Sequence, residues 1–147
     1  MSEPQPPITA ETLKADGWQI FPAPRGFSGQ MAPLWFQIVE ERLSVGFFVA
    51  AGHCNEHLGT LHGGAAMTFA DIAGGFRTAL TLGHQRCATL QLQTHFTAVA
   101  REGEFVSCDP EIVRQTKDIL FLRGILRTRE RAVLSFDGIW KVLADRS

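Results

Sequence analysis

The chain has 147 residues, of which 45% are hydrophobic and 20% are charged, a length and balance that predict one soluble globular domain. Fourteen Lys and Arg residues against fifteen Asp and Glu residues give a formal charge of −1. This charge provides no electrostatic attraction toward nucleic acid or an anionic membrane. Three cysteines, with no CxxC pair, disfavour a disulfide scaffold and a zinc-finger framework, and favour a reducing compartment.

The first ten residues contain neither the basic nor the apolar segment of a secretory signal. No apolar run reaches the ~18 residues that a membrane span needs. The sequence therefore predicts a cytoplasmic protein without a membrane segment.

Proline dominates the beginning of the chain, where six of the seven prolines lie in the first 33 residues. Because proline has no N–H for a sheet or a helix interior, we expect residues 1–30 to be an extension of a domain that spans residues 31–147. Within the extension, Thr9, Leu13 and Gly17 predict one short helix, as its cap, its apolar contact and its stop.

Residues 34–40 and 43–51 are rich in β-branched and aromatic side chains and predict two strands joined by a tight turn. After residue 85 come four more strand-like segments, 86–98, 104–114, 119–129 and 132–143. Strict alternation in the first of these predicts one face with Ala88, Leu90, Leu92, Phe96 and Ala98, and an opposite face with Thr89, Gln91, Gln93, His95 and Thr97. Pro110 indicates an edge position or a bulge in the second.

Residues 63–82 form the one long helical segment, and apolar residues on nearly all of its sides predict a buried helix. The helix follows two predicted strands and precedes four consecutive ones. This order predicts an α+β protein with an antiparallel sheet of about six strands. The pair Gly74–Gly75 costs roughly 1 kcal/mol per glycine relative to alanine, which indicates the close approach of another backbone or a ligand. Asp71, a carboxylate in this apolar helix, is either a structural ion-pair partner or a general base.

Gly63 and Gly64 stand where the helix begins. N–H groups at a helix start are open to an incoming oxygen, so this segment is either an oxyanion hole or only a glycine-rich turn. Asp71 follows Gly63 by eight residues, which is about 12 Å along a helix axis. One chain therefore cannot bring both to the same carbonyl, and two antiparallel helices from two chains are needed.

Residues 53–71, HCNEHLGTLHGGAAMTFAD, resemble the signature of the hotdog-fold acyl-CoA thioesterases, above all the phenylacetate-degradation-type (acyl-coenzyme A thioesterase 13-like) group. The matching features are Gly-x-x-His-Gly-Gly, an aspartate nine residues after His62, and Thr89 a further 18 residues on. The resemblance extends over about residues 34–143 and implies the hotdog fold, with a long central helix wrapped by the sheet.

The resemblance also implies a function, hydrolysis of an acyl-CoA thioester by a homodimer or homotetramer without a cofactor or a metal. Gly63 would polarise the carbonyl through its N–H, and Gly64 would contact the substrate. Asp71 of the partner subunit would act as base or nucleophile. Thr89 would position the water or the carboxylate, and His62 would shape the loop.

The loop departs from the family pattern, in which an asparagine lies six residues before the histidine. Glu56 occupies that position here, and Asn55 lies seven residues before His62. Either residue therefore remains a candidate for orienting the water or the substrate.

Other interpretations of the chemistry stay open. Four side chains could suggest zinc, but they lack a standard ligand spacing, and we expect no metal; they are His53, Cys54, His57 and His62. Cys54 is also an unsupported candidate nucleophile. The arginines at 123, 127, 129 and 131 share one face of an extended segment. Arg123, Arg127 and Arg129 are either solvated or a landing site for the phosphates of coenzyme A.

Two other function classes fit the same fold, a hotdog hydratase or lyase on acyl-thioesters and a non-catalytic acyl-CoA-binding protein. The glycines at the helix start, together with Asp71, favour hydrolysis.

Overall fold

The structure of the protein, a computed structural model, describes residues 2–145. Its elements in chain order are α1 (Ala10–Ala15), β1 (Gln19–Ile20), the 3₁₀ turn η1 (Phe27–Met31), β2 (Trp35–Val39), β3 (Arg42–Phe48), the 3₁₀ turn η2 (Ala51–His53), α2 (Gly63–Leu82), β4 (Cys87–Phe96), β5 (Phe105–Cys108), β6 (Glu111–Gln115), β7 (Ile119–Arg127) and β8 (Ala132–Val142).

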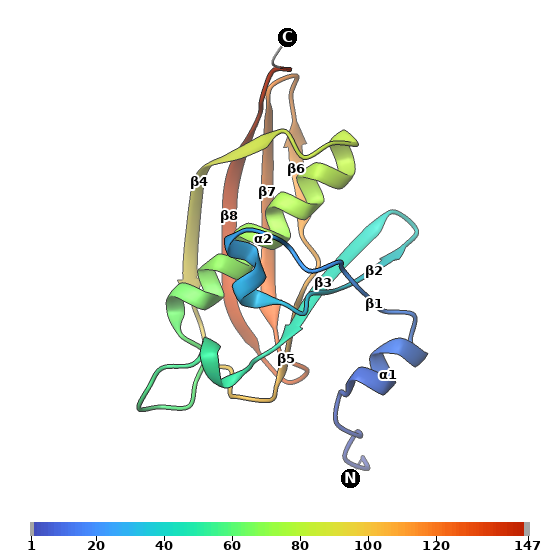
Figure 1. The fold of residues 1–147 in the computed structure, drawn as a ribbon, viewed down its shortest axis with the longest axis vertical. Coiled ribbons are helices and arrows are strands. Elements are labelled where there is room, and N and C mark those ends of the chain that lie inside the picture. The colour runs from blue at the N-terminus through green and yellow to red at the C-terminus, as the bar shows by residue number, and fades with distance from the viewer. Residues whose placement is uncertain (1, 146–147) are drawn as a thin grey trace.

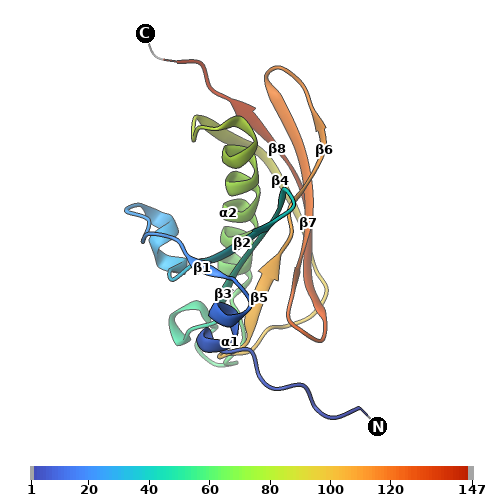
Figure 2. The ribbon, with the colours of Figure 1, turned by 90° about the vertical axis from the view of Figure 1, so that its right-hand side faces the viewer.

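The strands form one antiparallel sheet of eight strands in the order β1-β2-β3-β5-β7-β8-β4, with β6 added beside β7. Figures 1 and 2 show the long helix α2 lying across one face of this sheet. The α+β class and the bounds of the long helix are as predicted. Two strands more than expected are present, because β1 joins the sheet and Pro110 divides the predicted 104–114 strand into β5 and β6.

Helix α2 is buried along one face only. Phe69, Ala70 and Ala73 are fully buried against the sheet, whereas Met67 and Leu80 are 37% and 45% exposed. One sheet can cover only one face of a helix, so the predicted buried helix keeps several apolar side chains exposed in the single chain.

The glycine pair in α2 has two different surroundings. A Cβ at Gly74 would lie 2.3 Å from the indole ring of Trp140, so the close neighbour is a side chain and not the backbone or ligand that we expected. A Cβ at Gly75 would meet nothing within 4 Å. Gly74 is therefore explained by packing within the chain, and Gly75 is not.

Strand β4 contains a β-bulge between Thr89 and Gln91, where its pairing with β8 shifts by one residue. The extra residue, Leu90, changes the phase of the alternation. Thr89 pairs with Trp140 and Leu92 with Gly138, and both lie on the α2 side, which corrects the predicted assignment of these two residues to opposite faces.

The short helix α1 forms as predicted. Thr9 caps it, accepting a hydrogen bond from the backbone N–H of Thr12 at 3.2 Å, and Gly17 adopts a positive φ of 90° just after it. Leu13 lies in a second small core with Trp35 and Phe105. The segment before residue 31 therefore packs against the sheet. No helix within residues 2–145 is long and apolar enough to cross a membrane.

Candidate active site

The first residue of α2 presents an unengaged backbone donor. His62 is the N-cap, and its Nδ1 accepts the N–H of Gly64 at 2.8 Å. The N–H of Gly63 donates to no protein acceptor within residues 2–145. Helix N-termini leave such N–H groups free for a ligand. The two predicted glycines therefore differ, because only Gly63 has an N–H available to an incoming oxygen.

The loop before α2 is a small hairpin. Cys54 and Leu61 form an antiparallel bridge, and the backbone N–H of Asn55 donates to the Thr60 carbonyl at 2.8 Å. The side-chain Nδ2 of Asn55 donates to the same carbonyl at 3.3 Å. The N–H of Leu61 donates to Ala100 at 2.8 Å, which holds the hairpin against the following loop.

Glu56 and Asn55 have different environments in this hairpin. The side chain of Glu56 is 88% exposed, and its carboxylate lies 3.8 Å from Nε2 of His57. Asn55 is half-buried and bonded within the loop. Residues 56–58 form the turn of the hairpin.

The side chains of Asp71 in α2 and Thr89 in β4 contact each other where the helix and the strand leave them at least partly exposed. Thr89 Oγ1 donates a hydrogen bond to Asp71 Oδ1 at 2.5 Å, the short distance typical of a hydroxyl bound to a carboxylate. Asp71 is half-buried, and its second carboxylate oxygen has no hydrogen-bond partner within residues 2–145. The pair therefore fixes one oxygen of the carboxylate and leaves the other for a substrate or a water.

A free thiol lies near this pair. Burial, followed by the negative charge of Asp71, raises the pKa of the Cys87 thiol. Burial and the charge of Glu102 likewise raise the pKa of Cys54. Raised thiol pKa values lower the thiolate fraction near neutral pH, so neither cysteine is suited to act as a nucleophile.

Gly63 and Asp71 remain far apart in one chain, because eight residues of helix separate them by about 12 Å. Beside Gly63 lies Phe96, which the alternation of its strand predicts only to lie on an apolar face. Its ring is 3.4 Å from the position that a Gly63 Cβ would take, and the residue is 55% exposed. The sequence feature that could have placed Phe96 near the start of α2 is a large aromatic residue at the end of the strand that follows the helix.

The predicted arginine face does not reach the α2 site of its own chain. Arg123 and Arg127 alternate along β7 with Leu122 and Leu126, which are buried under α2, so the arginines lie on the opposite face of the sheet. Arg123 is ion-paired with Glu111 at 3.2 Å.

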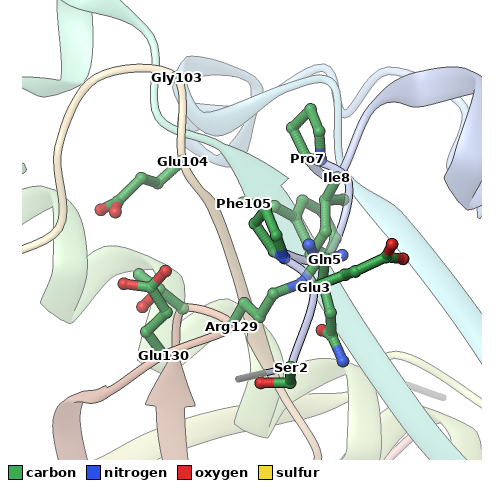
Figure 3. A pocket seen from close by; sticks show the side chains of 12 residues that line it. Ser2, Glu3, Gln5, Pro7, Ile8, Gly103, Glu104, Phe105, Arg129 and Glu130 are labelled. Carbon is green, nitrogen blue, oxygen red and sulfur yellow. The ribbon is translucent and has the colours of Figure 1, made fainter.

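Arg129 lies in the turn after β7 and donates from Nη1 to the carbonyl of Pro6. It lines a cavity of about 700 Å³ between the N-terminal segment and the start of β5. Figure 3 shows its side chain beside those of Glu3 and Gln5. The structure thus separates all three predicted arginines from Gly63 and Asp71.

The zinc candidates do not form a ligand set. Within residues 2–145, no three His, Cys, Asp or Glu side chains lie close enough together to hold a metal ion. His62 Nδ1 is instead occupied by the Gly64 N–H.

Known proteins resemble this chain in sequence and in fold. Residues 58–135 match the model of the thioesterase superfamily. A protein of Pseudomonas aeruginosa named "Putative esterase PA0474" is 30% identical over 105 residues, which are 71% of this chain and 78% of that protein.

Two solved structures illustrate the structural likeness. A phenylacetic acid degradation-related protein of Ralstonia eutropha superimposes with a TM-score of 0.70 at 19% identity, covering 78% of this chain and 88% of that one. A Bacillus halodurans protein determined with coenzyme A gives a TM-score of 0.68 at 24% identity, covering 76% of this chain and 74% of that one.

A long helix across an antiparallel sheet, with these neighbours, defines a hotdog-fold protein. The match over more than half of its residues shows that the chain belongs to the thioesterase superfamily.

Proposed function

We propose that the protein hydrolyses an acyl-CoA thioester to a free acid and coenzyme A. The observation that carries the proposal is the hydrogen bond from Thr89 to Asp71, which fixes a partly exposed carboxylate of α2. The unengaged N–H of Gly63 supports it, because thioester hydrolysis needs a donor for the oxygen on which charge develops. The coenzyme A in the structure of the Bacillus halodurans protein supports the substrate class.

The chemistry follows from these two groups. Gly63 donates its N–H to the thioester carbonyl oxygen and stabilises the tetrahedral intermediate; one such donor contributes about 10²–10³-fold to kcat in other hydrolases. The free oxygen of Asp71 takes a proton from water, whose oxygen bonds to the carbonyl carbon. The C–S bond then breaks, and the thiolate of coenzyme A leaves and takes up the proton. In the alternative route the same carboxylate oxygen attacks the carbonyl carbon directly, and the C–S bond breaks as the thiolate of coenzyme A leaves. Water then hydrolyses the resulting anhydride to the free acid and the Asp71 carboxylate, and the proton released goes to the thiolate.

Two subunits complete each site in this proposal. The N–H of Gly63 in one chain acts with Asp71 of the partner subunit, because about 12 Å of helix separates the two groups within a chain. Strand β4 supports a homodimer, because within residues 2–145 it pairs only with β8 and its ten residues leave one edge open. Long open edges are normally covered. Pairing of two such dimers into a tetramer is part of the same proposal.

The remaining predicted residues have supporting roles in the proposed reaction. Asn55 orients the water or the substrate, His62 fixes the start of α2, and Gly64 shapes the surface on which the substrate lies. The proposed site leaves out Arg123, Arg127 and Arg129, because they lie away from the α2 surface of their own chain.

The experiment that tests this function is the release of free thiol from a panel of aryl, medium-chain and long-chain acyl-CoAs. We expect turnover with at least one class and its loss in the Asp71→Asn variant. An enoyl-CoA belongs in the panel, because a hydratase would consume the double bond and leave the thioester intact. Binding of acyl-CoA without release of thiol would instead support a non-catalytic acyl-CoA-binding protein.

A further inference from the structure

His53 is a buried histidine with a hydrogen bond at each ring nitrogen. The residue is 8% exposed. Its Nδ1 accepts the backbone N–H of Ala50 at 3.0 Å, and its Nε2 lies 2.8 Å from the carbonyl oxygen of Gln30. Because Nδ1 accepts, it carries no proton, and Nε2 must donate to the carbonyl. One neutral tautomer therefore satisfies both contacts.

These contacts join three parts of the chain. Gln30 belongs to η1, Ala50 follows β3, and His53 ends η2. The His53 ring also stands edge-on to Phe47, with centroids 5.4 Å apart, and Phe47 packs against Phe69 of α2 at 4.6 Å. The imidazole is therefore held from several directions in the core beneath the helix.

The backbone of His53 connects directly to the proposed site. The N–H of His62 donates to the His53 carbonyl at 2.8 Å, and the side chain of His62 in turn caps α2 through Gly64. The direction of the Gly63 N–H is set by the peptide that joins His62 to Gly63. A displacement of His53 is thus transmitted to that peptide through this hydrogen bond and the adjacent hairpin pairing.

We propose that His53 is a positioning residue for the reaction. Its neutral imidazole anchors η2, and η2 holds His62 so that the Gly63 N–H points at the thioester carbonyl. This inference rests on the proposed function. A misplacement of about 1 Å can cost up to 10²-fold in rate, so loss of a remote anchor is sufficient to slow the chemical step.

Three variants separate this role from ordinary packing. In His53→Asn, the side-chain oxygen replaces Nδ1 as the acceptor for Ala50 but does not extend to Gln30. In His53→Leu, both hydrogen bonds are lost while an apolar side chain of similar size remains. His57→Leu is the matched control, because His57 lies in the same loop and its side chain is 86% exposed.

The measurement combines kinetics with hydrogen exchange on variants whose folding is checked by circular dichroism. We expect His53→Leu to lower kcat about tenfold with KM within about twofold, and His53→Asn to recover part of the loss. The exchange of the Gly64 amide should quicken in His53→Leu and stay unchanged in His57→Leu. A folded His53→Leu protein with the kcat of the wild type overturns the inference, even if its melting temperature falls.

A failure of the proposed function looks different. If the wild type releases thiol from no acyl-CoA, the hydrolase proposal fails and the exchange data decide the positioning role alone. Unchanged Gly64 exchange in His53→Leu would then overturn the inference.

Discussion

Thr89 Oγ1 lies 2.5 Å from Asp71 Oδ1, although 18 residues separate the two positions. Helix α2 and strand β4 run side by side in opposite directions, so the middle of the helix lies beside the beginning of the strand (Figure 1). The bulge at Leu90 then sets the phase that turns Thr89 toward α2 together with Leu92. Bulges frequently redirect one side chain of a strand.

The first prediction concerns this pair. Asp71→Asn keeps the size of the side chain and removes its basicity, so we expect a folded protein whose kcat falls by about 10²-fold or more. Thr89→Val removes the hydroxyl and keeps the shape, and should lower kcat by about tenfold, since one hydrogen bond to a charged group contributes about 1.5–3 kcal/mol. Thr89→Ser, which retains the hydroxyl, is the control. Wild-type turnover by Asp71→Asn would refute the assignment.

The sequence predicts most of this architecture because hydrophobic periodicity is local. The bounds of α2 and the cap of α1 follow from glycine, threonine and apolar spacing. The bulge at Leu90 does not follow, because it arises from the pairing of β4 with β8 and leaves no mark in the sequence of β4 alone. Strict alternation therefore failed at the very strand that carries Thr89.

The site was predictable to a different degree. The resemblance to a known family named Gly63, Asp71 and Thr89 as candidates, whereas nothing local in the sequence distinguished Gly63 from Gly64. That distinction depends on the side chain of His62, which occupies the N–H of Gly64. The partner of Arg129, the Pro6 carbonyl, lies 123 residues away in the chain, so periodicity had no means of finding it.

The second prediction tests the oxyanion donor by removing one N–H. Gly63 is the first residue of α2, a position that favours proline, and His62 has an extended backbone with ψ 137°, as a residue before proline requires. Gly63→Pro should therefore keep the helix and lower kcat by about 10²-fold. Gly63→Ala keeps the N–H, and its methyl group would lie 3.4 Å from Phe96, an ordinary contact. Equal activity of the two variants would exclude the N–H of Gly63 from the reaction.

The third prediction distinguishes Asn55 from Glu56 in the loop. Asn55 is half-buried and bonded to Thr60, whereas the side chain of Glu56 is 88% exposed. We therefore expect Asn55→Ala to lower kcat more than Glu56→Ala, measured with one good substrate. The reverse order would assign the loop role to Glu56. No effect from either variant would leave the reaction to Gly63 and Asp71.

The fourth prediction uses the two adjacent glycines of α2 as a matched pair. Gly74→Ala places a methyl group against the ring of Trp140 and should cost about 1–3 kcal/mol of unfolding free energy. Gly75→Ala meets no atom of its own chain within 4 Å, so helix propensity alone predicts a gain of roughly 1 kcal/mol. If a partner helix approaches at Gly75, the same change must instead raise the dissociation constant of the dimer. Light scattering over a concentration series measures that constant, and an unchanged value would place the interface away from Gly75.

The fifth prediction tests whether each site uses two chains, by mixing two inactive variants. Gly63→Pro and Asp71→Asn homodimers should each be nearly inactive. In a mixed dimer, one site combines an intact Gly63 with an intact Asp71 of the partner subunit, and the other site carries both defects. Random exchange at equal amounts makes half of the dimers mixed, so about one quarter of wild-type activity should return. Subunit exchange is verified by mass spectrometry of the native dimers. If exchange is complete and no activity returns, both groups act within one chain, and the shared site is wrong.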